Sequence, residues 1–402
     1  SGGTASNYTL TGGTHNFTVN RRIVSVSGTR LYDATTNAIA SDLSTHTNLV
    51  GSETLNLSGT GTIASKNVGS NKTVSVGTLT LADGSNGGLA ANYTLSGGTH
   101  QLTVNQRPLN ATLARQYDGT TTSAGSTLSS LDALQGGETL TMTGSGTAAS
   151  ANVANGIAMS SNGNLALVDG TGLASNYSLN STVINITPRV LNSSGSKIYD
   201  ANTDALAADI TLSNLVSGET LNHSGTATIS SANTGNYTIN NLTGITLADN
   251  TGTASNYTLT GGTHNFTVNP KVVSIQGNKT YDGNTTISSG DITSITDTVG
   301  AETLVISSGS GTVSSANAAT YASADINEGT LTLGNGTNGG LASNYTLTGH
   351  AASSFQVAQR VLSSSGSRIY DGSTTASSSD LTLSNLVGSE TLTLSGNGTL
   401  AN

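Results

Sequence analysis

The sequence predicts an all-β fold, a tandem array of small Ig-like or β-grasp-like β-sandwich domains that forms a rod. Three observations predict it. Small apolar residues alternate with Ser and Thr along much of the chain, as in strands with one buried face. Gly occurs 50 times and Pro three times, which favours tight turns over long helices. One set of spaced motifs recurs every 82 to 89 residues, the size of a small domain.

The Tyr-Asp pair marks the repeat most clearly. Its members are Tyr32-Asp33, Tyr117-Asp118, Tyr199-Asp200, Tyr281-Asp282 and Tyr370-Asp371. The motifs divide the chain into repeat 1 (22–106), repeat 2 (107–188), repeat 3 (189–270) and repeat 4 (271–359). Residues 1–21 match the C-terminal end of a preceding repeat, and residues 360–402 match the N-terminal half of a further one, here called the half-repeat.

Residues 3–20 show how closely the repeats are copied. They read GTASNYTLTGGTHNFTVN and return unchanged at residues 252–269, three repeats downstream. The two end fragments together lack about 21 residues of a repeat, which correspond to residues 65–85 of repeat 1. Two chains joined end to end would therefore not rebuild a domain. The simpler interpretation is a window cut from a longer array.

Alternation predicts the strands within a repeat. In repeat 1, residues 22–26, 53–57 and 78–81 place apolar side chains on one face. Residues 8–19 predict a β-hairpin, because Gly12 and Gly13 supply the positive φ that a two-residue turn needs. We expect six or seven short strands in each repeat.

A histidine follows the Gly-Gly pair at His15, His100 and His264, whereas Ile184 takes this place in repeat 2. One histidine per repeat on an exposed strand is expected to be a surface residue rather than a metal ligand.

Two recurring tyrosines account for ten of the fifteen aromatic residues: the tyrosine of Tyr-Asp and that of an Asn-Tyr pair near the end of each repeat. The second set is Tyr8, Tyr93, Tyr177, Tyr257 and Tyr345. Each side chain offers a large apolar ring and a hydroxyl that can bond a buried backbone group. We predict that these tyrosines pin the cores; the alternative is a stacking platform for sugars.

Charge is scarce, and 20 of the 35 charged residues occupy four recurring places. Besides the aspartates of Tyr-Asp, one place is the glutamate of Glu-Thr-Leu: Glu53, Glu138, Glu219, Glu302 and Glu390. Ten residues before each Tyr-Asp stands a base: Arg22, Arg107, Arg189, Lys271 and Arg360. Two residues before it stands another: Arg30, Arg115, Lys197, Lys279 and Arg368.

Three interpretations of these charges compete. A structural ion cluster, within a repeat or across a junction, would fix orientation more than add stability, because burying charge is costly even when it is paired. A calcium site at each junction is a second possibility, but Ca²⁺ takes six to eight oxygen ligands and each repeat offers two recurring acids beside two bases. A paired-carboxylate catalyst is the third, and five copies on small units argue against one shaped active site.

Composition excludes several classes of function. A net charge of −9 with 13 Lys and Arg disfavours binding to nucleic acid or to an anionic membrane. The absence of Cys excludes disulfides, thiolate metal sites and Cys nucleophiles. No Lys follows a Gly, so there is no phosphate-binding P-loop. We expect no enzymatic activity. We also expect no cofactor, with calcium at the junctions as the one alternative.

The junctions carry no flexible linker. Residues 19–23 and 268–272 pass from the last strand of one repeat into the first strand of the next without a Gly/Ser run or a Pro-rich spacer. Four compact units of roughly 30 Å each would make a rod on the order of 100 Å or more.

These motifs resemble the YDG domain and its MBG-type relatives. The resemblance rests on Arg/Lys-x-Tyr-Asp-Gly/Ala-x-Thr, Leu-Val-Ser-Gly-Glu-Thr-Leu, Ala-Ser-Asn-Tyr-Thr-Leu and Val-Asn-Pro-Lys/Arg, and it covers essentially the whole chain. Ala34 and Ala201 depart from it where Gly is expected. Such arrays occur in large bacterial surface and secreted proteins, including filamentous-haemagglutinin-like exoproteins of two-partner secretion. The resemblance implies an extracellular, adhesive or scaffold role.

We therefore expect the structural shaft of an extracellular bacterial adhesin or matrix fibre. Its partners would be other copies of itself, matrix polysaccharide or a host surface, with no nucleic acid and no membrane insertion in this segment. The alternative function is a multivalent binding module with weak glycan-binding or self-association sites on each repeat. The alternative architecture is a parallel β-helix, which would show a period near 20–25 residues instead.

Overall fold

The computed structural model describes residues 2–239 and 242–401, and the fold is all-β, as predicted. Two compact units divide the chain, Ser1–Arg189 and Val190–Asn402. In the described residues every helix is a three-residue 3₁₀ turn, and none is long and apolar enough to cross a membrane.

Short strands make up both repeats of the first unit. Those of repeat 1 are β1 (Arg22–Ile23), β2 (Ser25–Leu31), β3 (Asn37–Ile39), β4 (Thr45–Thr47), β5 (Leu55–Ser58), β6 (Thr60–Ile63), β7 (Gly69–Ser75), β8 (Thr80–Asp83), β9 (Tyr93–Thr94) and β10 (Gln101–Asn105). Those of repeat 2 are β11 (Arg107–Gln116), β12 (Thr122–Ala124), β13 (Leu128–Leu131), β14 (Leu140–Thr143), β15 (Ser145–Ala148), β16 (Ala154–Ser161), β17 (Ala166–Asp169) and β18 (Tyr177–Thr187). Both repeats exceed the six or seven strands expected, because turns and bulges divide their longer strands.

The remaining strands belong to repeats 3 and 4 and the half-repeat. Repeat 3 holds β19 (Arg189–Val190), β20 (Asn192–Ile198), β21 (Asp204–Leu206), β22 (Ile210–Ser213), β23 (Asn222–Thr228), β24 (Gly235–Thr238), β25 (Ile245–Ala248), β26 (Tyr257–Thr258) and β27 (His264–Asn269). Repeat 4 holds β28 (Lys271–Val272), β29 (Ser274–Thr280), β30 (Thr286–Ser288), β31 (Ile292–Thr296), β32 (Leu304–Ser308), β33 (Ser310–Val313), β34 (Ala319–Ala322), β35 (Ile326–Asn327), β36 (Thr332–Asn335), β37 (Tyr345–Thr346) and β38 (Ser354–Ala358). The half-repeat holds β39 (Ser363–Gly366), β40 (Thr375–Ser377), β41 (Leu381–Ser384) and β42 (Asn397–Thr399).

The 3₁₀ turns recur at two places in the repeats, before the strand β4 or its counterpart and before the Asn-Tyr tyrosine. They are η1 (Ala5–Asn7), η2 (Ala40–Asp42), η3 (Ala90–Asn92), η4 (Gly125–Thr127), η5 (Ala174–Asn176), η6 (Ala207–Asp209), η7 (Ala254–Asn256), η8 (Ser289–Asp291), η10 (Ala342–Asn344) and η11 (Ser378–Asp380), with η9 (Ser323–Asp325) as an addition in repeat 4.

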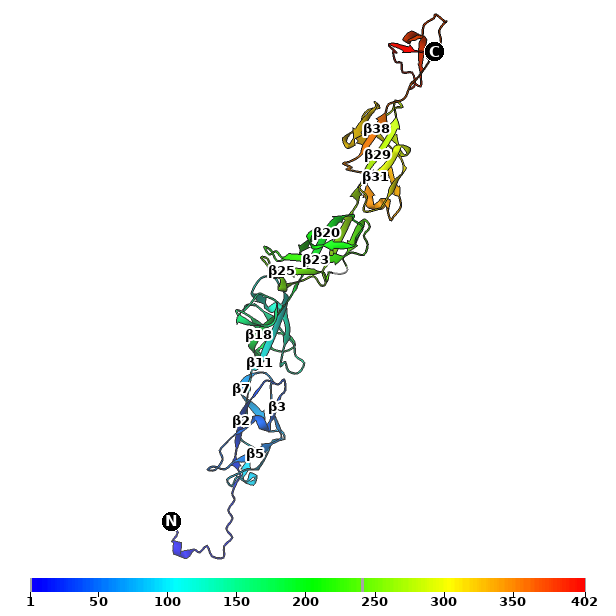
Figure 1. Ribbon diagram of the computed structural model, residues 1–402. Helices are drawn as coiled ribbons and strands as arrows, with labels where there is room; N and C mark the ends of the chain where they lie inside the picture. The colour runs from blue at the N-terminus through cyan, green and yellow to red at the C-terminus, as the bar shows by residue number, and fades with distance from the viewer. Residues whose placement is uncertain (1, 240–241, 402) are drawn as a thin grey trace. The chain divides into compact units, whose positions relative to one another are not determined.

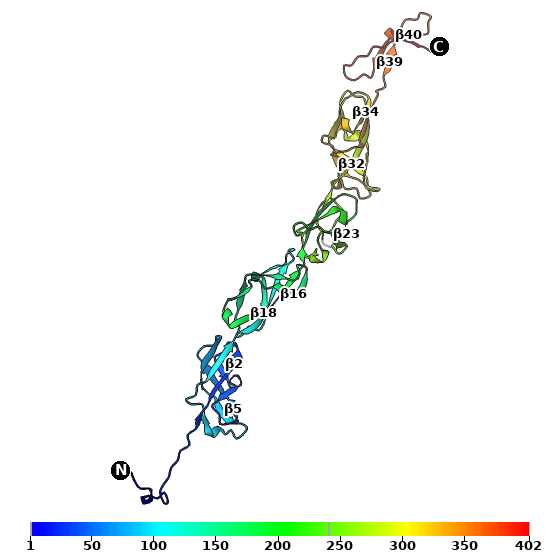
Figure 2. The same cartoon turned by 90° about the vertical axis from the view of Figure 1, so that its left-hand side faces the viewer.

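Each repeat is built around the same four strands. Their spatial orders are β4-β2-β10-β7, β13-β11-β18-β16, β22-β20-β27-β24 and β31-β29-β38-β34. The two middle strands are the first and last long strands of the repeat and run parallel, and the outer strands pair antiparallel to them. Figure 1 shows β29 between β31 and β38, and Figure 2 shows β16 beside β18. These are mixed sheets, not the coils of a parallel β-helix.

This parallel pairing fixes the place of the Tyr-Asp pair. Because the first and last strands run parallel, their C-terminal ends lie at the same edge of the sheet. Tyr32 follows β2, and its N–H donates to the carbonyl of Asn105 at the end of β10, at 2.9 Å. The same 2.9 Å bond joins Tyr117 to Thr187, Tyr199 to Asn269 and Tyr281 to Ala358. Tyr-Asp therefore lies where the chain leaves its own repeat.

The hairpin predicted over residues 8–19 is wrong. Those residues form no strand, and in repeat 1 the segments that flank the Gly-Gly pair do not pair with each other. Instead, β9 runs parallel to β1 and β10 runs parallel to β2. In repeat 2, which lacks the Gly-Gly pair, β18 continues along β11 with one bulge. The two glycines thus form a loop that interrupts one long strand. This loop begins at Gly97, whose φ is 83°.

The histidines after the Gly-Gly pair are not surface residues in intact repeats. His100 and His264 are 4% and 5% exposed. His100 Nε2 lies 2.9 Å from the carbonyl oxygen of Leu95, and the N–H of Val26 donates to its Nδ1 at 3.2 Å. A Cβ on Gly98 would lie 2.9 Å from the ring, so the loop needs glycine there. Through these two hydrogen bonds, the imidazole of His100 holds the loop against strand β2.

The strand register also corrects the position of Ile184. Gln101 pairs with Ser27, and Val183 pairs with Thr112, the counterpart of Ser27 in repeat 2. The residue before Val183, Thr182, therefore takes the place of His100. Counting from the tyrosine misplaced it because repeat 2 lacks the two glycines.

The cores extend across repeat boundaries inside each unit. In the first unit, Tyr32 and Val104 of repeat 1 belong to the same buried cluster as Leu109, Leu140 and Tyr177 of repeat 2. In the second unit, one buried cluster contains side chains of repeats 3 and 4, with Tyr199 and Tyr345 among them. Sharing a core lets small domains bury more apolar area than each could alone.

Replacing Ala34 by Gly should stabilise repeat 1. Ala34 has φ 62°, whereas its counterpart Gly119 has φ 78°. An alanine in the left-handed region costs about 1 kcal/mol relative to glycine, which outweighs the greater flexibility of the unfolded glycine chain. Calorimetry should show a rise in the melting temperature for Ala34→Gly and a fall for Gly119→Ala. A fall for Ala34→Gly would contradict the strain.

Candidate functional site

A cluster of polar side chains joins repeats 1 and 2 in the first unit. Tyr32 donates its hydroxyl to Glu138 Oε1 at 2.6 Å, and Tyr177 donates to Glu138 Oε2 at 2.9 Å. The two rings meet edge to face with centroids 5.3 Å apart. Tyr32 belongs to repeat 1, whereas Glu138 and Tyr177 belong to repeat 2. One carboxylate thus holds the tyrosines of two repeats.

Further bonds surround this junction. Lys66 of repeat 1 donates to Glu138 Oε1 at 2.7 Å. Asn176, which is 1% exposed, accepts from the N–H of Val68 at 2.9 Å and donates to Asn67 Oδ1 at 3.1 Å. The asparagine of Asn-Tyr is therefore also an inter-repeat contact. Sequence reasoning singled out the tyrosine of this pair and missed the asparagine, although it recurs at every Asn-Tyr.

Repeats 3 and 4 form the same junction in the second unit. Tyr199 and Tyr345 donate to the two carboxylate oxygens of Glu302 at 2.7 and 2.5 Å. Their ring centroids also lie 5.3 Å apart, edge to face. Asn344 accepts from the N–H of Thr234 and donates to Asn233 Oδ1, both at 2.9 Å. The geometry is common to both units, although Ala232 replaces Lys66.

Within a repeat, the glutamate and the Asn-Tyr tyrosine make a constant pair. Tyr93 donates to Glu53, and Tyr257 donates to Glu219 at 2.6 Å. The same hydroxyls accept the N–H groups of Val50 and Val216 at 3.1 Å. Each glutamate therefore has one oxygen bonded inside its repeat, and at the two junctions above the other oxygen bonds the preceding repeat.

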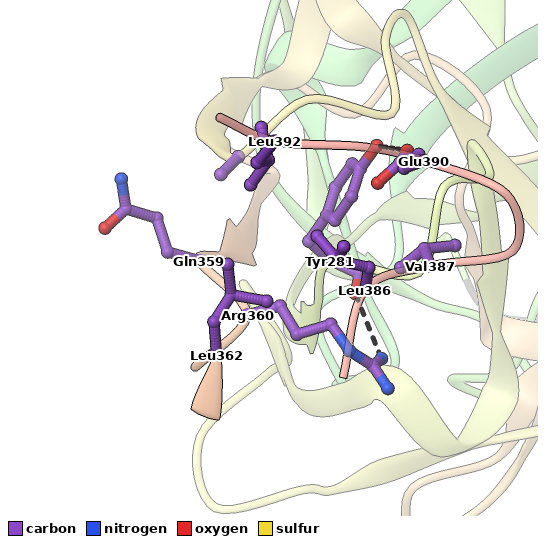
Figure 3. A pocket seen from close by; sticks show the side chains of 9 residues that line it. Tyr281, Gln359, Arg360, Leu362, Leu386, Val387, Glu390 and Leu392 are labelled. Atoms are coloured by element: carbon purple, nitrogen blue, oxygen red, sulfur yellow. Dashed lines mark hydrogen bonds between the residues drawn. The ribbon is translucent and has the colours of Figure 1, made fainter. Parts of the chain in front are cut away.

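The junction of repeat 4 with the half-repeat contains only part of this cluster. Tyr281 of repeat 4 donates its hydroxyl to Glu390 (Figure 3). Arg360 donates to the carbonyl of Tyr281 at 3.5 Å. A pocket of about 440 Å³ lies beside Tyr281 and Glu390.

The basic residue at the start of a repeat bonds backbone carbonyls. Arg22 Nε donates to Asn48 O at 2.8 Å, and Arg360 Nε donates to Asn385 O at 2.7 Å. Arg107 donates to Ala133 O at 3.1 Å and to Tyr32 O at 3.2 Å. Lys271 lies in β28 and pairs in register with Tyr345, and Arg189 begins β19. Arg107 and Arg360 thus reach the tyrosine of the preceding repeat.

The second basic residue pairs with the aspartate of Tyr-Asp, three residues on. The pairs are Arg30–Asp33 at 2.5 Å, Arg115–Asp118, Lys197–Asp200 at 2.8 Å, Lys279–Asp282 at 3.0 Å and Arg368–Asp371 at 2.6 Å. The recurring charges therefore differ from the single cluster that the sequence suggests. The ion pair of aspartate and base stabilises the Tyr-Asp turn, whereas the glutamate accepts hydrogen bonds from the tyrosine hydroxyls.

Lysine and arginine at this position have different partners. Lys279 Nζ donates to Asn284 Oδ1 at 2.9 Å, and Lys197 does the same to Asn202 at 2.7 Å. Where the base is arginine, the residue five positions on is Thr35, Thr120 or Ser373. The lysine ammonium is compact, so the longer asparagine side chain reaches it. The arginine guanidinium is larger and fills the same space, so a short Thr or Ser side chain stands beside it.

This difference predicts a coupled pair of substitutions. Lys279→Arg alone should destabilise repeat 4 by about 1 kcal/mol, because Asn284 occupies the space of the fork. Adding Asn284→Thr should recover most of that loss. Denaturation of the single and double variants gives the coupling energy, and simple additivity would contradict the prediction.

Burial and hydrogen bonding set the ionisation of the cluster. Burial, with the bond to Glu138 adding to it, raises the pKa of Tyr177 to about 12. Burial and then the bond to Glu302 raise the pKa of Tyr199 to about 12. Burial opposes the ionised form of Glu138, but the hydrogen bonds from Lys66, Tyr32 and Tyr177 outweigh it and hold the pKa of Glu138 below its ordinary value.

These shifts predict how junction stability depends on pH. A tyrosine whose folded pKa is raised contributes stability that is complete below pH 10 and lost as the pH rises through about 12. A carboxylate whose folded pKa is lowered contributes above its ordinary pKa and loses that contribution in acid. Melting temperatures should thus form a plateau from about pH 5 to pH 10. A steep loss near pH 8 would contradict the assignment.

Among the described residues, no three His, Asp or Glu side chains lie close enough together to hold a metal ion. At the junctions of repeats 1 and 2 and of repeats 3 and 4, the glutamate carboxylate is occupied by tyrosine hydroxyls. The arrangement holds two repeats together through one shared carboxylate acceptor.

The fold and this site define a class: a tandem-repeat β protein whose neighbouring repeats, within each unit, share a buried tyrosine–glutamate junction. The YDG domain matches residues 14–101, 100–184 and 185–265, and the chain belongs to this family. The matched ranges begin four to eight residues before repeats 1 to 3. No protein with a curated description matches the chain.

Proposed function

We propose that the chain is part of the structural shaft of an extracellular bacterial adhesin or matrix fibre. The observation that carries the proposal is the shared junction, in which Glu138 and Glu302 each accept hydroxyls from two successive repeats. A shaft requires neighbouring domains that keep a fixed relation under load. A common core with a buried acceptor supplies that relation more firmly than a flexible linker does.

Composition and copying also support this role. Few charges and many Ser, Thr and Asn side chains suit a surface that interacts weakly with its surroundings. The unchanged return of residues 3–20 at 252–269 suits a spacer, because adding a repeat adds reach without disturbing chemistry. On this proposal the protein is not an enzyme, needs no cofactor and acts outside the bacterial cell.

Pulling the 402-residue chain from both ends with optical tweezers tests the proposal. Repeats should unfold in discrete steps of about 30 nm each, the contour length of 82 to 89 residues at about 3.6 Å per residue. Glu302→Ala should lower the force for repeats 3 and 4 and leave the remaining steps unchanged. Smooth extension without steps would contradict a mechanical role.

A multivalent binding module is the alternative function. It predicts that immobilised chain captures matrix polysaccharide and that capture rises steeply with the number of repeats. A shaft predicts no such capture, so one surface-binding experiment separates the two.

A further inference from the structure

Three side chains beside the Tyr-Asp turn of repeat 4 form a closed set of hydrogen bonds. Lys279 Nζ lies 3.0 Å from Asp282 Oδ1 and donates to Asn284 Oδ1 at 2.9 Å. The amide nitrogen of Asn284 donates to Asp282 Oδ2 at 2.8 Å. One carboxylate thus bridges the amine and the amide, and the amine also lies against the amide carbonyl. We call this set the lysine–aspartate–asparagine triad.

Repeat 3 contains the same triad in Lys197, Asp200 and Asn202. Lys197 Nζ lies 2.8 Å from Asp200 Oδ1 and 2.7 Å from Asn202 Oδ1. The amide nitrogen of Asn202 donates to Asp200 Oδ2 at 2.9 Å, and its Oδ1 accepts the N–H of Asp204 at 2.9 Å. The same contacts at the same spacing make the triad a property of the repeat rather than of one loop.

The lysine of each triad is buried, with 8% and 6% of the side chain exposed in Lys197 and Lys279. In repeat 4 its ammonium also donates to the carbonyls of Asn284 and Thr286, both at 2.8 Å, which hold it beside the amide. The N–H of Thr286 donates to Asn284 Oδ1 at 2.9 Å. A backbone donor placed in this way stabilises the negative charge that develops on the oxygen when a nucleophile adds to the carbonyl carbon.

We propose that each triad forms an isopeptide bond between its lysine and its asparagine. The aspartate takes a proton from the lysine ammonium, and Nζ adds to Cγ of the asparagine. The carboxyl group gives its proton to Nδ2, and the Cγ–Nδ2 bond breaks. The second proton that Nζ loses passes through the same carboxylate to the departing ammonia, which leaves as ammonium. The new Nζ–Cγ bond is an amide, nothing is oxidised or reduced, and no other reactant is consumed.

Ionisation and geometry set the pace of this reaction. Burial opposes the ionised form of Asp282, but the hydrogen bonds from Lys279 and from the N–H of Asn284 outweigh it and hold the pKa of Asp282 below its ordinary value. The ion pair is thus the resting state. Adding the amide C=O length of about 1.2 Å to the 2.9 Å contact places Nζ within about 4 Å of Cγ, against about 3 to 3.5 Å for attack. We therefore expect the bond to form slowly after folding. Coupling of Lys279 with Asn284 is accordingly measured on freshly folded protein.

Repeats 1 and 2 are internal controls, because both have arginine at the lysine position. Arg30 and Arg115 are each followed five positions on by threonine instead of asparagine. A guanidinium stays protonated in proteins, and a threonine side chain has no carbonyl carbon to attack. Across the five Tyr-Asp motifs, lysine occurs only with asparagine, and arginine only with Thr or Ser. The nucleophile and its target are therefore present together or absent together.

The intact mass of the full chain after several days at neutral pH tests the proposal. It should fall below the mass of the sequence by two molecules of ammonia, one for each triad. Lys279→Arg should lose one ammonia, and so should Asp282→Asn, which removes the proton carrier. Lys72→Arg changes a lysine outside the triads, whose ammonium donates to the carbonyl of Ser65 at 3.3 Å, and should still lose two. Calorimetry of each variant shows whether it is folded. An unchanged mass of the wild-type chain would overturn the proposal.

Cleavage on the N-terminal side of aspartate locates the bond. The cut between Tyr281 and Asp282 lies between Lys279 and Asn284, so an isopeptide bond keeps the two resulting fragments joined. The same cut in repeats 1 and 2 should release separate fragments. Separate fragments at repeats 3 and 4, or an ammonia loss that persists when both triad lysines are replaced by arginine, would contradict the bond. This outcome is independent of the proposed function, because it requires neither force nor a binding partner.

Discussion

Glu302→Ala is expected to destabilise repeats 3 and 4 together by about 3 to 4 kcal/mol. The side chain accepts the hydroxyls of Tyr199 and Tyr345, which are 4% and 5% exposed. Truncation leaves two buried hydroxyls without this acceptor, and each such loss costs roughly 1 to 3 kcal/mol. Calorimetry of the full chain should show one transition lowered by roughly 10 °C, given a cooperative unit of this size.

Glu53→Ala is the matched control. Glu53 accepts the hydroxyl of Tyr93 inside repeat 1, and no tyrosine of another repeat donates to it among the described residues. Its loss should therefore be about half as large and confined to repeat 1. Equal shifts of the transition temperature for the two variants would show that the hydrogen bond between repeats contributes nothing to stability. The account of a shared junction would then be wrong.

Gly277→Ala is expected to cost about 3 kcal/mol in repeat 4. Gly277 lies in the middle of β29, where an added Cβ would come within 2.6 Å of the carbonyl oxygen of Asp291 and 2.8 Å of the Phe355 ring. Phe355 is fully buried and cannot move aside without opening the core. Tyrosine fluorescence during denaturant unfolding should show the loss.

Gly290→Ala controls for the loss of glycine flexibility in the same repeat. The nearest atom to its added Cβ is the Ser288 hydroxyl oxygen at 3.9 Å. Its stability should change by less than about 1 kcal/mol. Similar losses for both glycines would contradict the close approach to Phe355 as the cause of the effect.

The period, the fold class and the tyrosines were accessible from sequence because they rest on local pattern. Alternation and recurring Tyr-Asp and Asn-Tyr pairs give short strands and buried rings without knowledge of which strands pair. The Gly-Gly pair was misleading for the same reason. A two-residue glycine turn normally joins antiparallel neighbours, but here β10 returns to β2, a strand some seventy residues earlier.

The partners of the recurring charges were not accessible from sequence. Glu138 is 106 positions from Tyr32 and 39 from Tyr177, and only the fold brings these groups together. The sequence predicts that the recurring acids pair with the recurring bases. In the structure the glutamate instead accepts mainly from tyrosine hydroxyls. The recurrence of Glu, Tyr and Asn in each repeat could have suggested one shared site, since residues that recur together with little other charge have few alternative partners.

Amide hydrogen exchange at Val68 and Thr234 tests the central claim most directly. These N–H groups donate to Asn176 and Asn344 of the following repeat, both at 2.9 Å. If neighbouring repeats in each unit are held by a shared buried junction, both amides will exchange at least 100-fold more slowly than unstructured ones, as closed hydrogen bonds do. Exchange at the unstructured rate, while the strand amide of Leu102 stays protected, would contradict the account.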